Sequence, residues 1–296
     1  MNPSINLRAL LLGLSLIGCT TGAPAIAAVD ESVPSAIYTD SAPDRQNPAS
    51  MVVLHIPSHG SVINGIAYLP SGRGPYPIFV LCHGLPGNEK NLDLAQAVRR
   101  AGWVAVTFNY RGSWGSPGQF SFRGNLADAA AVLAYLRDPH NAKPLRADSD
   151  RIVIAGHSMG GWVAAQTAAR DKKLLGTVLI SAWDPSVPST HAATVADMAD
   201  NMETLSGVTP ESMAREVESL PKSASFSSAA EGLKDKPLLV LTADDGLAPA
   251  GQSLVDAVRA DGGSQVSLEH TATDHGWSDR RIALESRVIL WLQALH

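Results

Sequence analysis

The sequence of 296 residues predicts an α/β protein in which helices cover both faces of a mostly parallel, eight-stranded sheet. Two observations lead to this fold class. From residue 77 onward, short apolar segments alternate with stretches of about ten to fifteen residues that have helical periodicity, which is typical of βαβ units. Several apolar segments, such as PIFVLC and PLLVLTA, contain no alternating polar residues. Such strands are expected where a parallel sheet is buried on both faces.

Eight segments are expected to form the strands. The first two alternate in polarity and lie close together around a His-Gly turn, so we expect them to form an antiparallel edge. The other segments have the composition of buried strands. In chain order the eight predicted strands are 51–56, 63–69, 77–82, 103–109, 151–156, 174–180, 237–243 and 265–270.

Five helices are expected between and after these strands. Residues 123–137, for example, place Leu126, Ala130, Leu133 and Leu136 on one face, as a helix packed against a sheet requires. The five predicted helices are 90–101, 123–137, 159–170, 252–260 and 279–295.

Residues 182–235 interrupt the alternation after the sixth strand. A stretch of this length is too long for a plain loop in a compact domain, and it contains two segments with helical character, 191–205 and 210–220. We therefore expect a helical cap over 182–235. Its methionines (Met198, Met202 and Met213) fit either the wall of an acyl pocket or ordinary packing of the cap on the core.

Residues 1–27 have the features of an export signal. Arg8 precedes a short apolar run that cannot cross a bilayer as a helix but matches the central region of a signal peptide. Two cleavage sites are possible. The sequence LIGC, ending at Cys19, resembles a bacterial lipobox and would give a lipidated N-terminus, whereas AIA at 25–27 suits ordinary signal peptidase. We expect a periplasmic, lipid-anchored outer-membrane or secreted protein.

The rest of the chain divides into a lead-in and one domain. Residues 28–50 are rich in Pro, Ser and Asp and have no periodicity, so we expect a flexible lead-in. Residues 51–296 are expected to form the α/β domain.

Composition excludes several classes of protein. With 45% apolar and 17% charged residues the chain is not disordered. Its net charge of −5 does not show the excess of Lys and Arg that binds nucleic-acid phosphates. Removal of the leader leaves Cys82 alone, so no intramolecular disulfide is available. His55 and His59 are four residues apart in a strand-like segment, which does not align them for a metal. We predict no metal and no organic cofactor.

The motif Gly156-His157-Ser158-Met159-Gly160 fits G-x-S-x-G and stands directly between a predicted strand and a predicted helix. In that context a strained turn exposes the serine hydroxyl at the carboxyl edge of the sheet. Ser158 is therefore the predicted nucleophile. A glycine-rich turn with a purely structural use is the alternative interpretation.

A serine nucleophile needs a base, and the base needs an acid that orients it. The expected chain order is serine, acid, histidine. Asp244 and Asp245 follow the strand 237–243, and His275 lies in the loop after the strand 265–270, so both loops converge on the crevice at the carboxyl ends of the strands. Of the nine histidines, only His275 has this order and this placement, whereas His83 and His157 are assigned to turns.

Five segments make the chain similar to the α/β-hydrolase superfamily, and more narrowly to prolyl-oligopeptidase and dienelactone-hydrolase relatives. The resemblance extends over residues 51–295. It rests on HGLPGNEKN (83–91), FNYRGSWGSPGQ (108–119), DSDRIVIAGHSMGG (148–161), TADDGLAP (242–249) and TDHGWSDRR (273–281).

The resemblance implies roles for further residues. In such relatives the acid commonly stands four residues before a proline, which favours Asp245 (with Pro249) over Asp244, and some members place the acid at the position of Asp184. Backbone N–H groups of Leu85 and Met159 are expected to form an oxyanion hole.

These residues predict an exported serine hydrolase that cleaves carboxylic esters through an acyl-enzyme. Related peptidases gain peptide specificity from a large N-terminal propeller, and only about twenty residues precede the first predicted strand here, so an esterase is favoured over a peptidase. A binding module without catalysis on the same fold is a third hypothesis. The expected partner is a small-molecule ester or a short peptide, with membrane attachment if Cys19 is lipidated.

Overall fold

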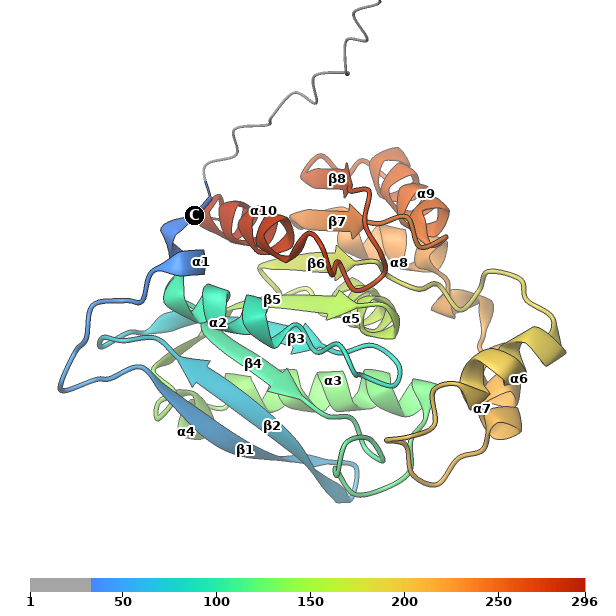
Figure 1. Ribbon diagram of the computed structural model, residues 1–296, viewed down its shortest axis with the longest axis horizontal. Helices are drawn as coiled ribbons and strands as arrows, with labels where there is room; N and C mark the ends of the chain where they lie inside the picture. The colour runs from blue at the N-terminus through green and yellow to red at the C-terminus, as the bar shows by residue number, and fades with distance from the viewer. Residues whose placement is uncertain (1–32, 296) are drawn as a thin grey trace, which may run out of the picture. The chain divides into compact units, whose positions relative to one another are not determined.

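An eight-stranded sheet forms the centre of the computed structural model, which describes residues 33–295 (Figure 1). The strand order is β1-β2-β4-β3-β5-β6-β7-β8. β2 runs antiparallel to both β1 and β4, and all other neighbours are parallel, which confirms the predicted fold class and its antiparallel edge. The strands are β1 (Ser50–Ser58), β2 (Ser61–Leu69), β3 (Tyr76–Cys82), β4 (Val104–Phe108), β5 (Ala147–His157), β6 (Gly176–Ile180), β7 (Leu238–Thr242) and β8 (Val266–His270).

The inner strands of the sheet are buried on both faces, which explains their apolar sequences. In β3, Ile78 and Val80 enter one hydrophobic core, whereas Phe79 and Leu81 enter a second core on the opposite face. Successive side chains of a strand point to opposite faces, so every position must be apolar when both faces are covered.

Helices form the two outer layers. α1 (Ser35–Tyr38), α2 (Leu92–Arg100) and α10 (Arg281–Gln293) contribute to one core. α3 (Phe122–Arg137), α5 (Met159–Arg170), α8 (Phe226–Leu233) and α9 (Ala248–Ala260) contribute to the other. A short helix, α4 (Pro139–Ala142), follows α3. α9 begins four residues before the predicted start at 252, because Pro249 is tolerated in the first turn of a helix.

The excursion between β6 and β7 contains more than a cap. α6 (His191–Ala199) and α7 (Pro210–Glu218) pack against each other, and we call these two helices and their connecting residues the cap. A short 3₁₀ turn (Lys222–Ala224) leads into α8, which packs on α5 and α9. A Cβ on Gly232 of α8 would overlap the Ala169 carbonyl of α5. The predicted cap bounds of 182–235 therefore include one helix of the core.

The first of the cap helices is shorter than predicted. α6 ends at Ala199 instead of continuing to residue 205, because the residues that follow bond to the loop after β4. The Trp114 N–H donates to the Thr204 carbonyl, and the Phe120 N–H donates to the Ser206 carbonyl. These bonds attach the cap to the loop 110–120.

The described part of the lead-in, residues 33–49, lies against the domain. Arg100 of α2 donates hydrogen bonds to the carbonyls of Ala36 and Ile37, and Arg146 donates one to the carbonyl of Pro48. The predicted export signal and Cys19 lie outside the described residues. Within residues 33–295, no helix combines the length and the apolar character needed to span a bilayer.

Candidate active site

Ser158 stands at a sharp turn between β5 and α5. Its backbone angles are φ 55° and ψ −123°, a strained conformation for a residue with a side chain. The flanking glycines permit this turn, because a Cβ on Gly156 would overlap the Gly160 carbonyl and a Cβ on Gly160 would overlap the Cys82 carbonyl. The turn places the Ser158 side chain in a pocket at the carboxyl end of the sheet.

Asp245 and His275 meet in the same pocket. The Nδ1 of His275 donates to Oδ2 of Asp245 at 2.8 Å, and Oδ1 of Asp245 accepts from the Leu247 N–H at 2.9 Å. The Asp245 side chain is 4% exposed and that of His275 is 42% exposed. Burial alone would raise the pKa of Asp245, but the hydrogen bonds from His275 and Leu247 outweigh it and lower that pKa. Asp245 is therefore a charged partner for the imidazole.

The other two candidate acids have different partners. Asp244 is exposed and lies 3.0 Å from Nε2 of His270. Asp184 is buried and accepts hydrogen bonds from the backbone N–H groups of Ser186 and Phe226, the second of which is the first residue of α8. Of the three aspartates, Asp245 is the one that the structure places against His275.

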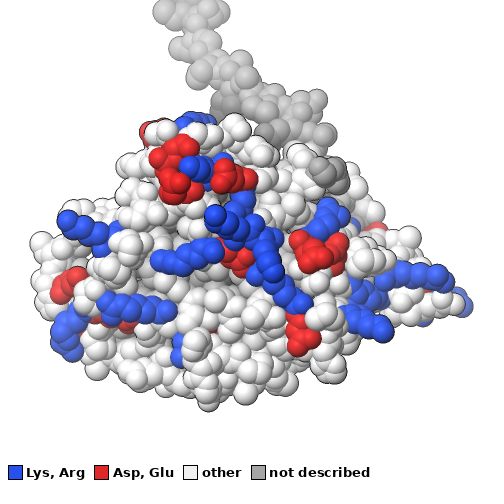
Figure 2. Space-filling model, turned by 180° about the vertical axis from the view of Figure 1, so that it is seen from behind, with Lys and Arg blue, Asp and Glu red and all other residues white. Residues whose placement is uncertain are grey.

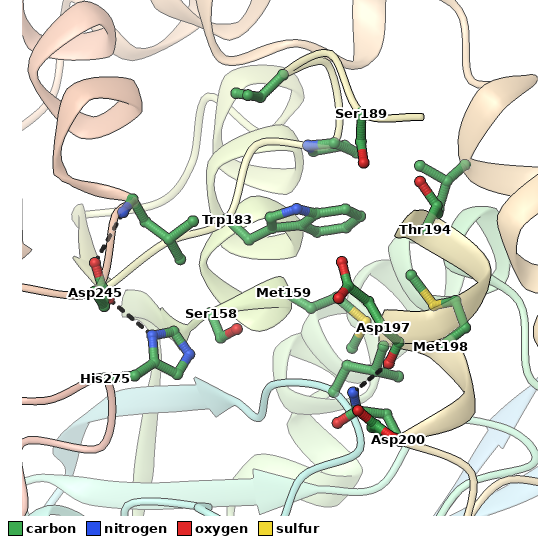
Figure 3. Close-up of a pocket in the computed structure, with 16 residues that line it drawn as sticks. Ser158, Met159, Trp183, Ser189, Thr194, Asp197, Met198, Asp200, Asp245 and His275 are labelled. Carbon is green, nitrogen blue, oxygen red and sulfur yellow. Dashed lines mark hydrogen bonds and ion pairs between the residues drawn. The ribbon is translucent and has the colours of Figure 1, made fainter. Parts of the chain in front are cut away.

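The imidazole of His275 lies beside Ser158 in the pocket. Figure 3 shows one ring nitrogen directed at Asp245 and the other on the side of Ser158. The structure thus brings together the three residues that the sequence predicts for a triad, although they are distant along the chain.

Two further contacts hold the loop that carries His275, and the sequence did not identify them. His157 donates from Nε2 to the His275 carbonyl at 2.8 Å, and the two rings lie 4.6 Å apart. Burial, followed by the neighbouring His275, lowers the pKa of His157 to about 4, so His157 is neutral near pH 7. Trp277, which is fully buried, donates from Nε1 to the Ser181 hydroxyl at 3.1 Å.

Arg281 attaches the same loop to α2. Its guanidinium donates to the Gly276 carbonyl at 2.9 Å and to Oδ2 of Asp93 at 2.7 Å. Glu285, one turn further along α10, lies in the same group, and burial together with the charge of Asp93 raises its pKa to about 7. The two Arg281 hydrogen bonds therefore attach the His275 loop to α2.

The loop after β3 lies directly beside Ser158. A Cβ on Gly84 would stand 3.0 Å from the Ser158 Cβ, and Leu85 and Met159 line the pocket together with Ser158. Among residues 33–295, neither the Leu85 N–H nor the Met159 N–H donates to another protein group outside regular helix and strand bonding. Both backbone donors are therefore available to an oxygen beside Ser158.

The pocket has a volume of about 530 Å³ and lies between the sheet edge and the cap (Figure 3). Trp183, Thr194, Met198 and Val217 contribute to its wall. Met198 is the cap methionine that lines this pocket, whereas Met213 is buried in the core. Asp197 and Asp200 add two carboxylates from α6 and its end, and no Lys or Arg of the described chain lines the pocket.

The Cys82 thiol and the possible metal ligands were also candidates for chemistry. Burial raises the pKa of Cys82 to about 12, which keeps this thiol protonated and unreactive. Within the described residues, no three His, Cys, Asp or Glu side chains are grouped in a way that could hold a metal ion.

On the face shown in Figure 2, Lys and Arg side chains are interspersed with Asp and Glu side chains.

Comparison with known proteins identifies the family. Residues 79–292 match the model of the alpha/beta hydrolase family. An uncharacterized protein of Mycobacterium tuberculosis is 28% identical over 141 residues, which cover 40% of this chain and 48% of the relative, so the chain spans about half the length of the curated relatives it matches, or less.

Two solved structures show the same fold. The carboxylesterase EstE1 from a metagenomic library has a TM-score of 0.62 at 23% identity and covers 84% of this chain and 90% of its own. The acylaminoacyl peptidase of Pyrococcus horikoshii has a TM-score of 0.60 at 18% identity and covers 83% of this chain and 41% of its own. The family match covers most of the chain and includes the turn at Ser158 and the loops of Asp245 and His275, so this protein belongs to the alpha/beta hydrolase family.

Proposed function

We propose that this protein is an exported serine hydrolase that cleaves carboxylic esters of small molecules. The observation that carries the proposal is the hydrogen bond between Asp245 and His275 in the pocket that also contains Ser158. A serine, a histidine and a buried carboxylate in this arrangement supply a nucleophile, a base and the group that orients the base.

The proposed reaction begins when the Ser158 hydroxyl attacks the ester carbonyl and transfers its proton to Nε2 of His275. Asp245 accepts a hydrogen bond from the Nδ1–H of His275 and stabilises the imidazolium that forms. The N–H groups of Leu85 and Met159 donate hydrogen bonds to the carbonyl oxygen as it becomes negative. His275 returns the proton to the leaving alcohol, and the acyl group remains on Ser158 as an ester. Water, activated by His275, then releases the carboxylic acid and restores the serine.

The pocket supports a small and uncharged substrate. Its volume of about 530 Å³ is in the range of small-molecule sites, which is roughly 300 to 1,000 Å³. Asp197 and Asp200 would repel an anionic substrate, because no Lys or Arg of the described chain lines the pocket to offset them.

A paired substrate panel tests the reaction. Purified protein should hydrolyse p-nitrophenyl butanoate and should hydrolyse aminoacyl-p-nitroanilides at least a hundredfold more slowly. The Ser158→Ala variant, which retains the fold, should lose on the order of a thousandfold or more of the esterase activity. Faster cleavage of the anilides would identify a peptidase, and absence of both activities in folded wild type would contradict the proposal.

The export part of the proposal has its own test. The mass of the protein isolated from its natural host should correspond to a chain that begins either at Ala28 or at a lipid-modified Cys19. A Cys19→Ala variant distinguishes these two N-termini. If the wild-type protein is lipid-modified at Cys19, the variant should differ from it in mass and in the fraction bound to membranes; if cleavage occurs before Ala28, neither should change. An unprocessed N-terminus at Met1 would contradict export.

A further inference from the structure

A second cavity lies beside the Ser158 pocket. It has a volume of about 320 Å³ and is lined by residues 185–189, by α6 and α7 and by the segment that follows α7. The two cavities meet at five residues that line both of them: Pro185, Val187, Ser189, Thr194 and Val217. The two cavities are therefore adjacent, and these five residues form the boundary between them.

The second cavity offers both apolar and polar surface to a ligand, with the apolar surface slightly larger. Leu220, Pro188, Pro221 and Ala224 contribute hydrocarbon groups to its wall. Two of its polar side chains already have partners: the Thr194 hydroxyl donates to the Thr190 carbonyl at 3.1 Å, and the Glu218 carboxylate lies 2.6 Å from Nδ1 of His191. The other polar lining residues are Ser186, Ser189 and Lys222, and the exposed Lys222 can keep its ammonium group in water. The hydrocarbon part of the wall can therefore accept an acyl chain.

The position of His275 decides which part of an ester would enter this cavity. His275 lies on one side of Ser158, and Thr194 and Ser189 lie on the other (Figure 3). Because His275 must protonate the departing alcohol, the alcohol lies over His275. The acyl group is attached to the carbonyl carbon opposite the alcohol and is therefore directed toward the cap.

We infer that the second cavity is a binding site for the far end of the acyl chain of the substrate, which makes esters of medium-chain and longer fatty acids the preferred class. The inference rests on the proposed esterase function. The acyl chain passes from Ser158 over Thr194 and Val217 and ends among Leu220, Pro221 and Ala224.

Two series of esters test the inference. In p-nitrophenyl esters from acetate to decanoate, kcat/KM should rise by up to roughly fourfold for each methylene that becomes buried. In acetate esters of alcohols of the same lengths, kcat/KM should change less than threefold over the whole series. A flat or falling acyl series would overturn the inference, and so would a steep dependence on alcohol length.

A variant in the second cavity alone gives a second test. Leu220→Trp, at a residue that lines the second cavity and not the Ser158 pocket, should lower kcat/KM for the octanoate ester at least tenfold and leave the acetate ester within twofold. Arg215→Trp places the same ring on the exposed side of α7 and should leave both esters unchanged. Ser186→Trp, at an exposed position that lines only the second cavity, should act like Leu220→Trp and replaces it if that variant does not fold.

The outcomes separate this inference from the proposed function. If Ser158 reacts with a fluorophosphonate and acetate esters are hydrolysed, but acyl length has no effect, the acyl-chain site is wrong and the esterase remains. If Ser158 does not react and no ester is hydrolysed, both are wrong.

Discussion

The imidazole of His157 packs on the imidazole of His275, with ring centres 4.6 Å apart, and donates a hydrogen bond to the His275 backbone carbonyl. His157 is the residue before the proposed nucleophile, so one short segment positions both Ser158 and the base that would activate it. The pKa of His157 is lowered to about 4, mainly by burial, which keeps a positive charge away from His275 near neutral pH.

Replacement of His157 by Phe should lower kcat/KM for p-nitrophenyl butanoate by about fivefold. The ring contact remains, but the hydrogen bond to the His275 carbonyl is lost, and one such bond contributes about 1 kcal/mol. The shape of the pH–rate curve above pH 5 should not change, because His157 is already neutral there. His140→Phe, at an exposed position, is the control. Equal activity of His157→Phe and wild type would show that this bond does not position His275.

Replacement of Asp245 by Asn should lower kcat on the order of a thousandfold or more. An amide at this position can present an N–H to His275, which would favour the wrong tautomer, and it cannot stabilise the imidazolium. Asp244→Asn is the matched control, because Asp244 pairs with His270 instead of His275, and its activity should stay within threefold of wild type. If Asp244→Asn were the damaging change, Asp245 would not be the acid.

Glu285 gives a prediction for stability instead of activity. Burial and the charge of Asp93 raise its pKa to about 7 from the ordinary value of 4.5, so the folded protein binds a proton here that the unfolded chain releases. The contribution of Glu285 to stability is therefore largest below about pH 4.5 and decreases as pH rises to about 7.

The difference in Tm between Glu285→Gln and wild type isolates this group. Gln cannot ionise, so the Tm of the variant should improve relative to wild type as pH is raised from 5 to 8, as measured by thermal unfolding. Glu203→Gln, which alters an exposed carboxylate, should show a much smaller change with pH. A Tm difference for Glu285→Gln that does not vary with pH would contradict the assigned protonation.

The strands and the candidate site could be predicted because local patterns specify them. PIFVLC is apolar at every position and PLLVLTA at every position except Thr242, and the structure shows the reason in the two cores that Phe79 and Val80 enter from opposite faces. Gly156 and Gly160 identify the turn at Ser158 because no larger residue fits there. Strand ends followed by short polar loops identify Asp245 and His275.

Features that depend on distant contacts could not be predicted in this way. α8 has the unremarkable sequence FSSAAEGL, and only its packing on α5 and α9 makes it part of the core. The end of α6 depends on bonds between residues 204–206 and the loop 110–120. Nothing local in the sequence indicates that His157 contacts His275, because 118 positions separate the two residues.

Reaction with a fluorophosphonate probe, followed by mass spectrometry of the peptides, tests the central claim most directly. The folded wild-type protein should carry one adduct on Ser158, and the Ser158→Ala variant should carry none, because only a serine that His275 activates reacts rapidly with such a probe. A folded wild-type protein that does not react, or a Ser158→Ala variant that reacts equally fast at another residue, would contradict the account.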